Sequence, residues 1–318
     1  MFIILLASIV IVSIATALSG STYAIRFATN YMMWIALAQS LNTITGYVGR
    51  VDFGHVLFFG IGAYATAYLY LNGVPWYIAL LAAPAAAALA AVILGFPTLR
   101  LHGAYFAIAT WSFAEAMKQI VYNTEALGSS FGLPIPPTLG YISTLALMTL
   151  VAIFALSMNW AIERSRLGLA FNAIRGNELV ASTAGVDVVR YRVLAYALSA
   201  IPAALAGGIY TFWISYVYPD DVFHGLKTDQ MFVMTLLGGA GSFIGVFIGT
   251  TIVSIVYEIL WTFFSEQLYL VFLGVMLMAI VVFMPNGVAH YMGLRTYSAR
   301  RLLYSLIPPQ LLGYRKKE

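Results

Sequence analysis

Long runs of apolar residues constrain the fold of this chain more than any other feature. Segments such as "AVILGF", "LALMTLVAIFAL" and "VFLGVMLMAIVVF" do not alternate with polar residues. About 20 apolar residues in a helix cross a hydrocarbon core roughly 30 Å thick, whereas the strands of a membrane barrel alternate in segments of about ten. Of the 318 residues, 62% are hydrophobic and 9% are charged, while an ordinary globular chain is about 25% charged. We therefore predict an all-α, polytopic transmembrane helix bundle in a lipid bilayer.

The apolar runs and the residues that break them predict eight spans, over 2–19, 28–46, 54–72, 75–97, 103–121, 139–161, 193–214 and 266–284. The first lacks the basic start of a signal peptide and is too long for one, so we expect it to be a span. A further apolar region, 230–263, is interrupted by "GGAGS". We expect two short or broken crossings there, which gives ten spans. The alternative is eight spans with a glycine-rich re-entrant element.

The placement of charge predicts an orientation. The stretch 164–192 holds five arginines, and the C-terminal 25 residues hold six Lys or Arg. Because cytoplasmic loops collect Lys and Arg, we expect both segments and the N-terminus to lie in the cytoplasm. A membrane domain over 1–290 is then followed by a basic cytoplasmic tail over 291–318. The acidic stretch "YPDDVFHGLKTDQ" falls outside with three aspartates against one lysine, and Arg26 is the one basic residue before residue 164 that this scheme places outside.

Catalytic motifs are absent from the sequence. The chain has no cysteine, no phosphate-binding loop G-x-x-x-x-G-K-[ST], no H-E-x-x-H, no G-x-S-x-G and no dense metal-ligand cluster. We expect no enzyme activity, no catalytic residue and no bound cofactor or metal. No basic patch interleaved with aromatic residues indicates nucleic-acid binding. An ion- or proton-coupled carrier is an open alternative, and its coupling residues would be intramembrane groups such as Glu115, Glu258 or Asp52.

The arginine-rich stretch predicts a helix, a turn and a second helix. Asn177 is placed to cap the second helix, Glu178 lies in its first turn and Gly185 ends it. So short a helix is unstable alone, so it must pack against something. The small residues 181–185 suit docking into a partner, although the stretch could also be an ordinary loop that only fixes orientation. The first helix is predicted by an apolar stripe of residues spaced i, i+3, i+4 and i+7: Leu167, Ala170, Phe171 and Ile174.

This stretch resembles the long cytoplasmic loop of permease subunits of branched-chain amino acid ABC transporters. The residues that match the family's loop in order are Arg164, Ser165, Arg166, Gly168, Ala173, Ile174, Arg175, Glu178, Ala181 and Gly185. Other stretches also resemble that family, namely "GYVGRVDFGHVLFFGIGAYATA", "LRLHGAYFAIATWSFAE", "LGGAGSFIGVFIGT" and the terminal "FMPNGV". Together they cover most of residues 40 to 290, and the loop resembles the M-type of the two homologous permeases.

The resemblance implies a subunit of an ATP-driven importer in the cytoplasmic (inner) membrane. Its implied partners are two cytoplasmic ATPase subunits that use the ATP, a second homologous permease, and a periplasmic or extracellular solute-binding protein. The segment 163–192 would be the ATPase-coupling loop, and its implied residues are Arg164, Arg166, Arg175, Glu178, Ala181 and Gly185. Branched-chain amino acids are the default solute by resemblance, while urea, amides and aromatic acids are carried by relatives.

Several polar residues and glycines in the apolar regions are candidates for the translocation path. The glycines could instead serve close helix packing. Arg50 and Asp52 stand where many relatives are uncharged, and they could pair with each other at a boundary. His55 could be a structural hydrogen-bonding group, and Lys118 could neutralise Glu115 three residues away. The path candidates are Asp52, Gly54, His55, Gly60, Glu115, Gly238, Gly239 and Gly241.

Overall fold

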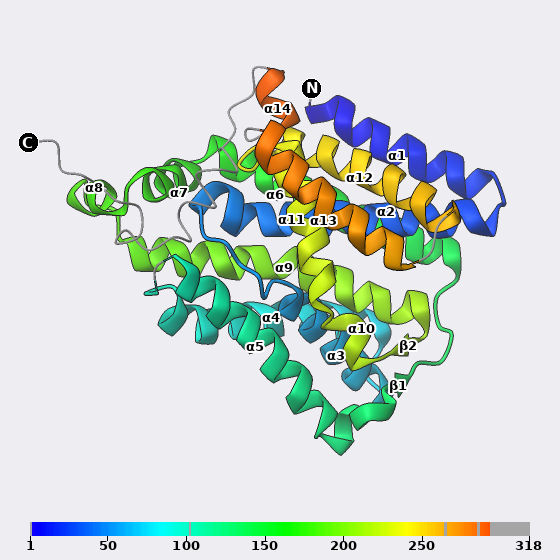
Figure 1. Cartoon of the computed structure of the whole chain (residues 1–318). Coiled ribbons are helices and arrows are strands. Elements are labelled where there is room, and N and C mark those ends of the chain that lie inside the picture. Colours follow the sequence, from blue (N-terminus) through cyan, green and yellow to red (C-terminus); the bar gives the residue numbers. More distant parts are fainter. Residues whose placement is uncertain (1, 102, 264–265, 285–286, 293–318) are drawn as a thin grey trace, which may run out of the picture.

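The computed structural model describes residues 2–101, 103–263, 266–284 and 287–292 (Figure 1). The helices are α1 (Phe2–Leu18), α2 (Thr22–Leu41), η1 (Asn42–Val48), α3 (Val56–Leu71), α4 (Trp76–Thr98), α5 (Ala104–Tyr122), η2 (Glu125–Leu127), η3 (Ser129–Phe131), α6 (Tyr141–Arg164), α7 (Arg166–Gly176), α8 (Glu178–Thr183), α9 (Val188–Ile214), α10 (Pro219–Val222), α11 (Gly225–Gly238), α12 (Phe243–Phe263), α13 (Glu266–Phe283) and α14 (Val288–Tyr291). Two short antiparallel strands, β1 (Leu133–Pro134) and β2 (Tyr216–Val217), pair with each other. The predicted all-α bundle is confirmed, while the basic tail falls outside the described residues from 293 onward.

Every predicted span coincides with a helix. Helices α4, α6, α9 and the first 18 residues of α12 are long and apolar enough to cross a membrane, and α1 and α3 are apolar but shorter. The largest shift in a span's start is at α2, which begins six residues before the predicted span. Ser21 starts it early by accepting a hydrogen bond from the Ala24 amide, which is a normal helix N-cap.

The glycine-rich break divides 225–263 into two helices. Helix α11 ends at Gly238 and α12 begins at Phe243. Between them Gly239 and Gly241 have φ angles of 108° and 86°, a region that glycine enters without steric penalty. This is the pair of helices that ten spans require. Since α11 has 14 residues, it is about 21 Å long and too short to cross the hydrocarbon core by itself.

A second break follows α2, which the sequence analysis extended as one span to residue 46. The chain continues instead as the π-helix η1, which ends at Gly49 with φ of 79°. Residues 50–52 then run without helix to the turn before α3, and they are buried. A π-helical segment leaves the regular backbone pattern, and such segments are frequent at functional sites.

Helix α9 lies at the centre of the bundle. It packs against α3 and α4 on one side and against α2 and α6 on the other (Figure 1). The approach to α3 is close, because a Cβ added at Gly207 would overlap the carbonyl of Phe59 and one at Gly62 would overlap that of Ala204. Small residues allow membrane helices to approach in this way.

The two ends of the bundle carry different elements. Helices α7 and α8 lie at one end, and α10 lies with β2 at the opposite end (Figure 1). We call these the α8 end and the α10 end. The turn between α1 and α2 and the C-terminal part of α12 also lie toward the α10 end (Figure 1).

Candidate functional site

The predicted helix-turn-helix is confirmed as α7 and α8. Ser165 caps α7 by accepting a hydrogen bond from the Gly168 amide at 3.3 Å. Asn177 caps α8 by accepting from the amides of Leu179 and Val180 at 2.9 and 3.2 Å. Gly185 follows α8 with φ of 85°. The predicted apolar stripe of α7 faces the bundle, with Ala170, Phe171 and Ile174 buried and Leu167 half-buried.

The outer face of α8 carries more than the predicted patch of small residues. Ser182, Thr183, Ala184 and Gly185 are exposed, as the prediction expected, but Ala181 is buried with 2% of its surface exposed, so it supports α8 and is closed to a partner. The exposed face carries two large apolar side chains, Leu179 at 74% and Val180 at 61% exposure. Sequence reasoning missed both, although a leucine and a valine directly after a polar cap were a visible signal.

Glu178 anchors the first turn of α8 to the bundle. Its Oε1 lies 2.6 Å from Nη2 of Arg50 and also forms an ion pair with Arg192. Arg50 donates to the Leu101 carbonyl at 2.9 Å and Arg192 to the Leu99 carbonyl at 3.2 Å. The Leu99 carbonyl belongs to the C-cap of α4, where orphan carbonyls and the helix dipole favour positive charge, and Leu101 lies three residues after the end of that helix. One carboxylate and two carbonyls at or just after the end of α4 therefore hold two buried guanidinium groups.

Arg50 is charged despite its burial. Loss of water lowers its pKa to about 10, so the guanidinium stays protonated at neutral pH. The suggested local pairing of Arg50 with Asp52 is not the one observed, because Arg50 pairs with Glu178 and Asp52 with His55.

Arg175 joins α7 to both breaks in the bundle. Its Nη1 donates to the Gly46 carbonyl in η1 at 2.6 Å. A Cβ at Gly49 would lie 2.7 Å from Arg175 Cγ, and one at Gly241 would overlap the guanidinium. The Gly241 amide in turn donates to the Asn42 side chain at 2.8 Å. The arginine thus lies between the end of η1 and the break before α12.

The other arginines of the stretch point away from these anchors. Arg164 is exposed and stacks 4.8 Å from the ring of Trp160, and Arg166 is exposed. Arg190 is exposed and pairs with Asp187 at 2.9 Å. Within the coupling stretch, Arg175 and Arg192 therefore hold the segment to the bundle, while Arg164, Arg166 and Arg190 lie on its surface.

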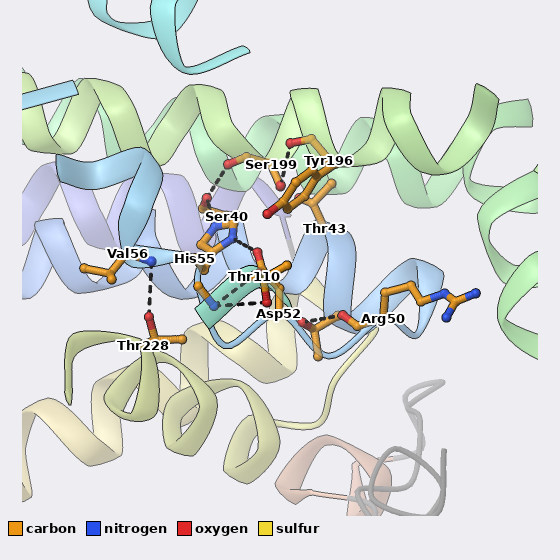
Figure 2. Close-up of polar contacts among 12 residues, drawn as sticks. Ser40, Thr43, Arg50, Asp52, His55, Val56, Thr110, Tyr196, Ser199 and Thr228 are labelled. Atoms are coloured by element: carbon orange, nitrogen blue, oxygen red, sulfur yellow. Dashed lines mark hydrogen bonds and ion pairs between the residues drawn. The ribbon is translucent and has the colours of Figure 1, made fainter. Parts of the chain in front are cut away.

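A buried polar cluster lies next to Arg50 along the chain (Figure 2). His55 Nδ1 is 2.8 Å from Asp52 Oδ2, and His55 Nε2 is 2.7 Å from Ser40 Oγ. The Gly54 amide donates to Asp52 at 3.1 Å, and the Val56 amide donates to Thr228 on α11 at 3.1 Å. Asp52, His55, Ser40 and Thr228 are all fully buried. The cluster ties the irregular segment to α2 and α11.

The order of Ser40, His55 and Asp52 is that of a hydrolytic triad, but its geometry is structural. The hydroxyl of Ser40 donates its one hydrogen to the Ser199 carbonyl on α9. A triad serine must instead donate to the histidine and be reachable by substrate. Ser40 is fully buried, so the cluster has the contacts of a structural hydrogen-bond network.

The other path candidates make close packing contacts. A Cβ at Gly54 would overlap the backbone of Thr110, one at Gly60 the ring of Phe223, and one at Gly238 the backbone of Gly245. Glu115 pairs with Lys118 at 2.9 Å, which is the neutralising contact expected if Glu115 has a structural role. Whether any of the eight candidates lines a path stays a prediction.

A cavity of about 880 Å³ at the α10 end contains functional candidates, of which the sequence analysis named only Glu258, as a possible coupling residue of a carrier. It lies among α2, α9, α10, α11 and α12, and its lining includes the charged residues Arg26, Asp221, Lys227 and Glu258. A further signal was Arg26, a basic residue on the outer side of the predicted orientation.

Comparisons with known proteins agree with the resemblance. The high-affinity branched-chain amino acid transport system permease protein LivM of Escherichia coli (strain K12) is 26% identical in an alignment of 315 positions, gaps included. This alignment covers 89% of this chain and 73% of LivM. LivM of Salmonella typhimurium is 25% identical with the same coverage. The autoinducer 2 import system permease protein LsrC of Enterobacter sp. (strain 638) is 28% identical over 250 residues, 73% of this chain and 69% of LsrC. No solved structure matches the chain.

The family described as "Branched-chain amino acid transport system / permease component" matches residues 23–281. That range includes α2 to α12, and so both helix breaks, the coupling segment and the buried cluster. These relatives are transport permeases and not enzymes. Because the match spans most of the chain, the protein belongs to this family of ABC-transporter permeases.

Proposed function

We propose that this permease is one of two membrane subunits of an ATP-driven importer for branched-chain amino acids or similar small solutes. It works in the cytoplasmic membrane with its N- and C-termini and its α8 end in the cytoplasm. Two ATPase subunits bind and hydrolyse ATP, and this chain binds none. A second homologous permease completes the path, and a solute-binding protein delivers the solute at the α10 end.

The observation that carries this proposal is the anchoring of α8. Leu179 and Val180 are exposed on a helix of six residues, a length that is unstable without support. Two partly buried groups, Glu178 and Arg175, connect this exposed face to the bundle. When a partner binds Leu179 and Val180 and moves, its movement therefore reaches the bundle through ion pairs and hydrogen bonds and not through a flexible loop.

The anchors end at the two breaks of the bundle. Arg175 contacts η1 and Gly241, and Glu178 contacts Arg50 in the irregular segment before α3. Helix breaks and element ends are where packed helices change direction. Closure of the ATPase pair would thus tilt α3 and α12 relative to α2 and open the path to one side at a time.

The test places a charge on the exposed face of α8. Leu179→Asp and Val180→Asp are introduced into the full-length chain, which is co-expressed with the other transporter subunits. We expect each variant to insert normally and to lose at least about tenfold in ATPase association, because apolar anchors in the centre of an interface carry most of its energy. Association is measured by co-purification, and uptake by ATP-driven accumulation of radiolabelled leucine in proteoliposomes.

The matched control is Leu169→Asp on α7, which changes an equally apolar side chain with 71% exposure in the same segment. It should keep association and uptake. Normal uptake by Leu179→Asp and Val180→Asp would overturn the docking role. Leucine uptake that needs no ATPase and is abolished by an uncoupler would instead support an ion- or proton-coupled carrier.

A further inference from the structure

The cavity at the α10 end holds one cation and one anion that lack an ion-pair partner among the residues that the structure describes. Lys227 pairs with Asp221 at 2.5 Å, so these two charges neutralise each other. Arg26 and Glu258 form no ion pair with any residue that the structure describes. Glu258 accepts a hydrogen bond from Tyr23, one turn before Arg26 on α2, so both charges face the same cavity.

A buried amide in the same cavity also lacks a partner. Gln230 on α11 lines the cavity with only 6% of its surface exposed. Its Nε2 donates to no group in the described part of the chain. A buried donor without an acceptor is unfavourable and is rare in folded proteins. A ligand with an acceptor atom would satisfy it.

The remaining walls of the cavity are mainly apolar or aromatic, with Thr22, Asn30 and His224 as further polar residues. Met33 and Trp34 on α2 and Ile214 on α9 contribute to them. Binding sites for small molecules combine such walls with a few placed polar groups in a volume of roughly 300–1,000 Å³. This cavity fits that description.

We infer that the cavity binds a free amino acid with an apolar side chain before it enters the path. Arg26 and the Gln230 amide would bind the carboxylate, Glu258 would bind the ammonium group, and the apolar walls would contact the side chain. One small ligand then supplies every partner that the cavity lacks. The inference rests on the proposed function, because it names the substrate class of the same importer at the end opposite α8.

A lipid headgroup with a phosphate and a primary amine shares this chemistry, so the experiment must separate the two sources. The full-length chain, with the subunits that co-purify with it, is placed in nanodiscs of phosphatidylglycerol alone or with added phosphatidylethanolamine. Equilibrium binding is measured for leucine, for leucinamide, which lacks the carboxylate, and for 4-methylpentanoate, which lacks the ammonium group. We expect saturable leucine binding at least about tenfold tighter than either analogue, since each analogue loses a charge-assisted contact, and independent of phosphatidylethanolamine.

Each cavity variant should weaken the binding of some ligands and leave that of others unchanged, whereas unfolding would abolish the binding of all of them. Arg26→Gln should weaken leucine binding by about tenfold and leave leucinamide unchanged, whereas Glu258→Gln should weaken leucine and leave 4-methylpentanoate unchanged. Gln230→Leu should act like Arg26→Gln. Arg190→Gln, an exposed change at the α8 end, is the matched control and should bind all three ligands normally.

Two outcomes overturn the inference. One is equal leucine binding by the wild type, Arg26→Gln and Glu258→Gln. The other is suppression of leucine binding by phosphatidylethanolamine, which would assign the cavity to a headgroup. Uptake into proteoliposomes distinguishes a failure of the cavity proposal from a failure of the proposed function. Normal ATP-driven uptake by Arg26→Gln with unchanged leucine binding would refute the cavity alone, and leucine binding without ATP-driven uptake would refute the importer alone.

Discussion

The charges at the two ends of the bundle are arranged in opposite ways. At the α8 end, Arg50 and Arg192 are almost fully buried and share Glu178. At the α10 end, Arg26 is exposed and Glu258 is half-buried, and both line an open cavity. Buried charges need partners inside the protein, because removing them from water costs several kcal/mol per ion. The comparison indicates that buried charges hold the structure together at the α8 end, whereas Arg26 and Glu258 at the α10 end have no ion-pair partner among the described residues.

The largest effect is expected when the carboxylate that Arg50 and Arg192 share is removed. Glu178→Gln leaves Arg50 and Arg192 with the carbonyls of Leu101 and Leu99 but without the counter-charge of Glu178. We expect a loss of roughly 3 kcal/mol in the free energy of unfolding, at the lower end of the range for a broken buried pair because Glu178 is 36% exposed. The measurement is the denaturation midpoint of the detergent-solubilised chain.

The matched control for Glu178 is Asp187→Asn in the same segment. Asp187 pairs with Arg190, and their side chains are 47% and 87% exposed. An exposed pair contributes at most about 1 kcal/mol, so this variant should remain near the wild type. Equal destabilisation by the two substitutions would show that burial at the α8 end has no energetic role.

Substitutions at Gly241 and Gly185 separate the cost of backbone strain from the cost of losing the contact with Arg175. Gly241 and Gly185 have nearly equal φ angles of 86° and 85°. A Cβ at Gly185 meets nothing within 4 Å, whereas one at Gly241 overlaps the Arg175 guanidinium. Gly185→Ala should cost about 1 kcal/mol from the left-handed backbone alone, and Gly241→Ala about 2 kcal/mol or more.

The same denaturation experiment measures both alanine variants, and the wild type is the reference. Gly241→Ala should also reduce ATP-driven uptake per ATP hydrolysed, because it displaces the arginine that joins α7 to the break. If the two variants lose equal stability, the Arg175 contact contributes nothing and the proposed connection between the coupling segment and α12 must be abandoned.

The α10 end should respond in the opposite way. Arg26 has no ion-pair partner among the described residues, so Arg26→Gln should change the free energy of unfolding by less than about 0.5 kcal/mol. The denaturation midpoint without leucine tests this. With saturating leucine, the wild type should gain stability by mass action while Arg26→Gln gains less. A clear loss of stability in the absence of ligand would make Arg26 a structural residue like Arg50.

Local patterns of sequence predicted the helices, their caps and the local pair of Glu115 with Lys118, but not the partners of charges that are distant along the chain. Apolar runs located the spans, Asn177 marked the start of α8, and the glycines marked the break before α12. The partners of Glu178 could not be read in the same way, because Arg50 lies 128 residues away along the chain. Such contacts depend on which helix ends meet, and periodicity within one helix does not encode that.

Two features that sequence reasoning missed have related causes. The π-helix η1 has an ordinary apolar and polar composition, "NTITGYV", and its wider turn follows from packing against α9 and α7. The cavity at the α10 end draws its residues from five helices. Glu258 was noted beforehand only as a charge in an apolar segment, and Arg26 was conspicuous because it conflicted with the positive-inside pattern. A residue that violates a general pattern was thus the best available pointer to the cavity.

The smallest expected effect concerns an exposed charge outside the cavity at the α10 end. A hydrogen bond from Tyr122 lowers the pKa of Asp220 below its usual value of 3.8. A carboxyl group with a lowered folded-state pKa stabilises the protein at pH values above 3.8, and this contribution is lost as the pH falls through the folded-state pKa. The gain is small, because an exposed carboxylate is well screened by water. Tyr122→Phe should therefore be slightly less stable than the wild type at pH 6, and the difference in denaturation midpoint should shrink and then vanish as the pH falls through the folded-state pKa of Asp220. A difference that grew on acidification would mean that Asp220 is stabilised in its protonated form, and the α10 end would then hold a buried acid rather than an open, solvated charge.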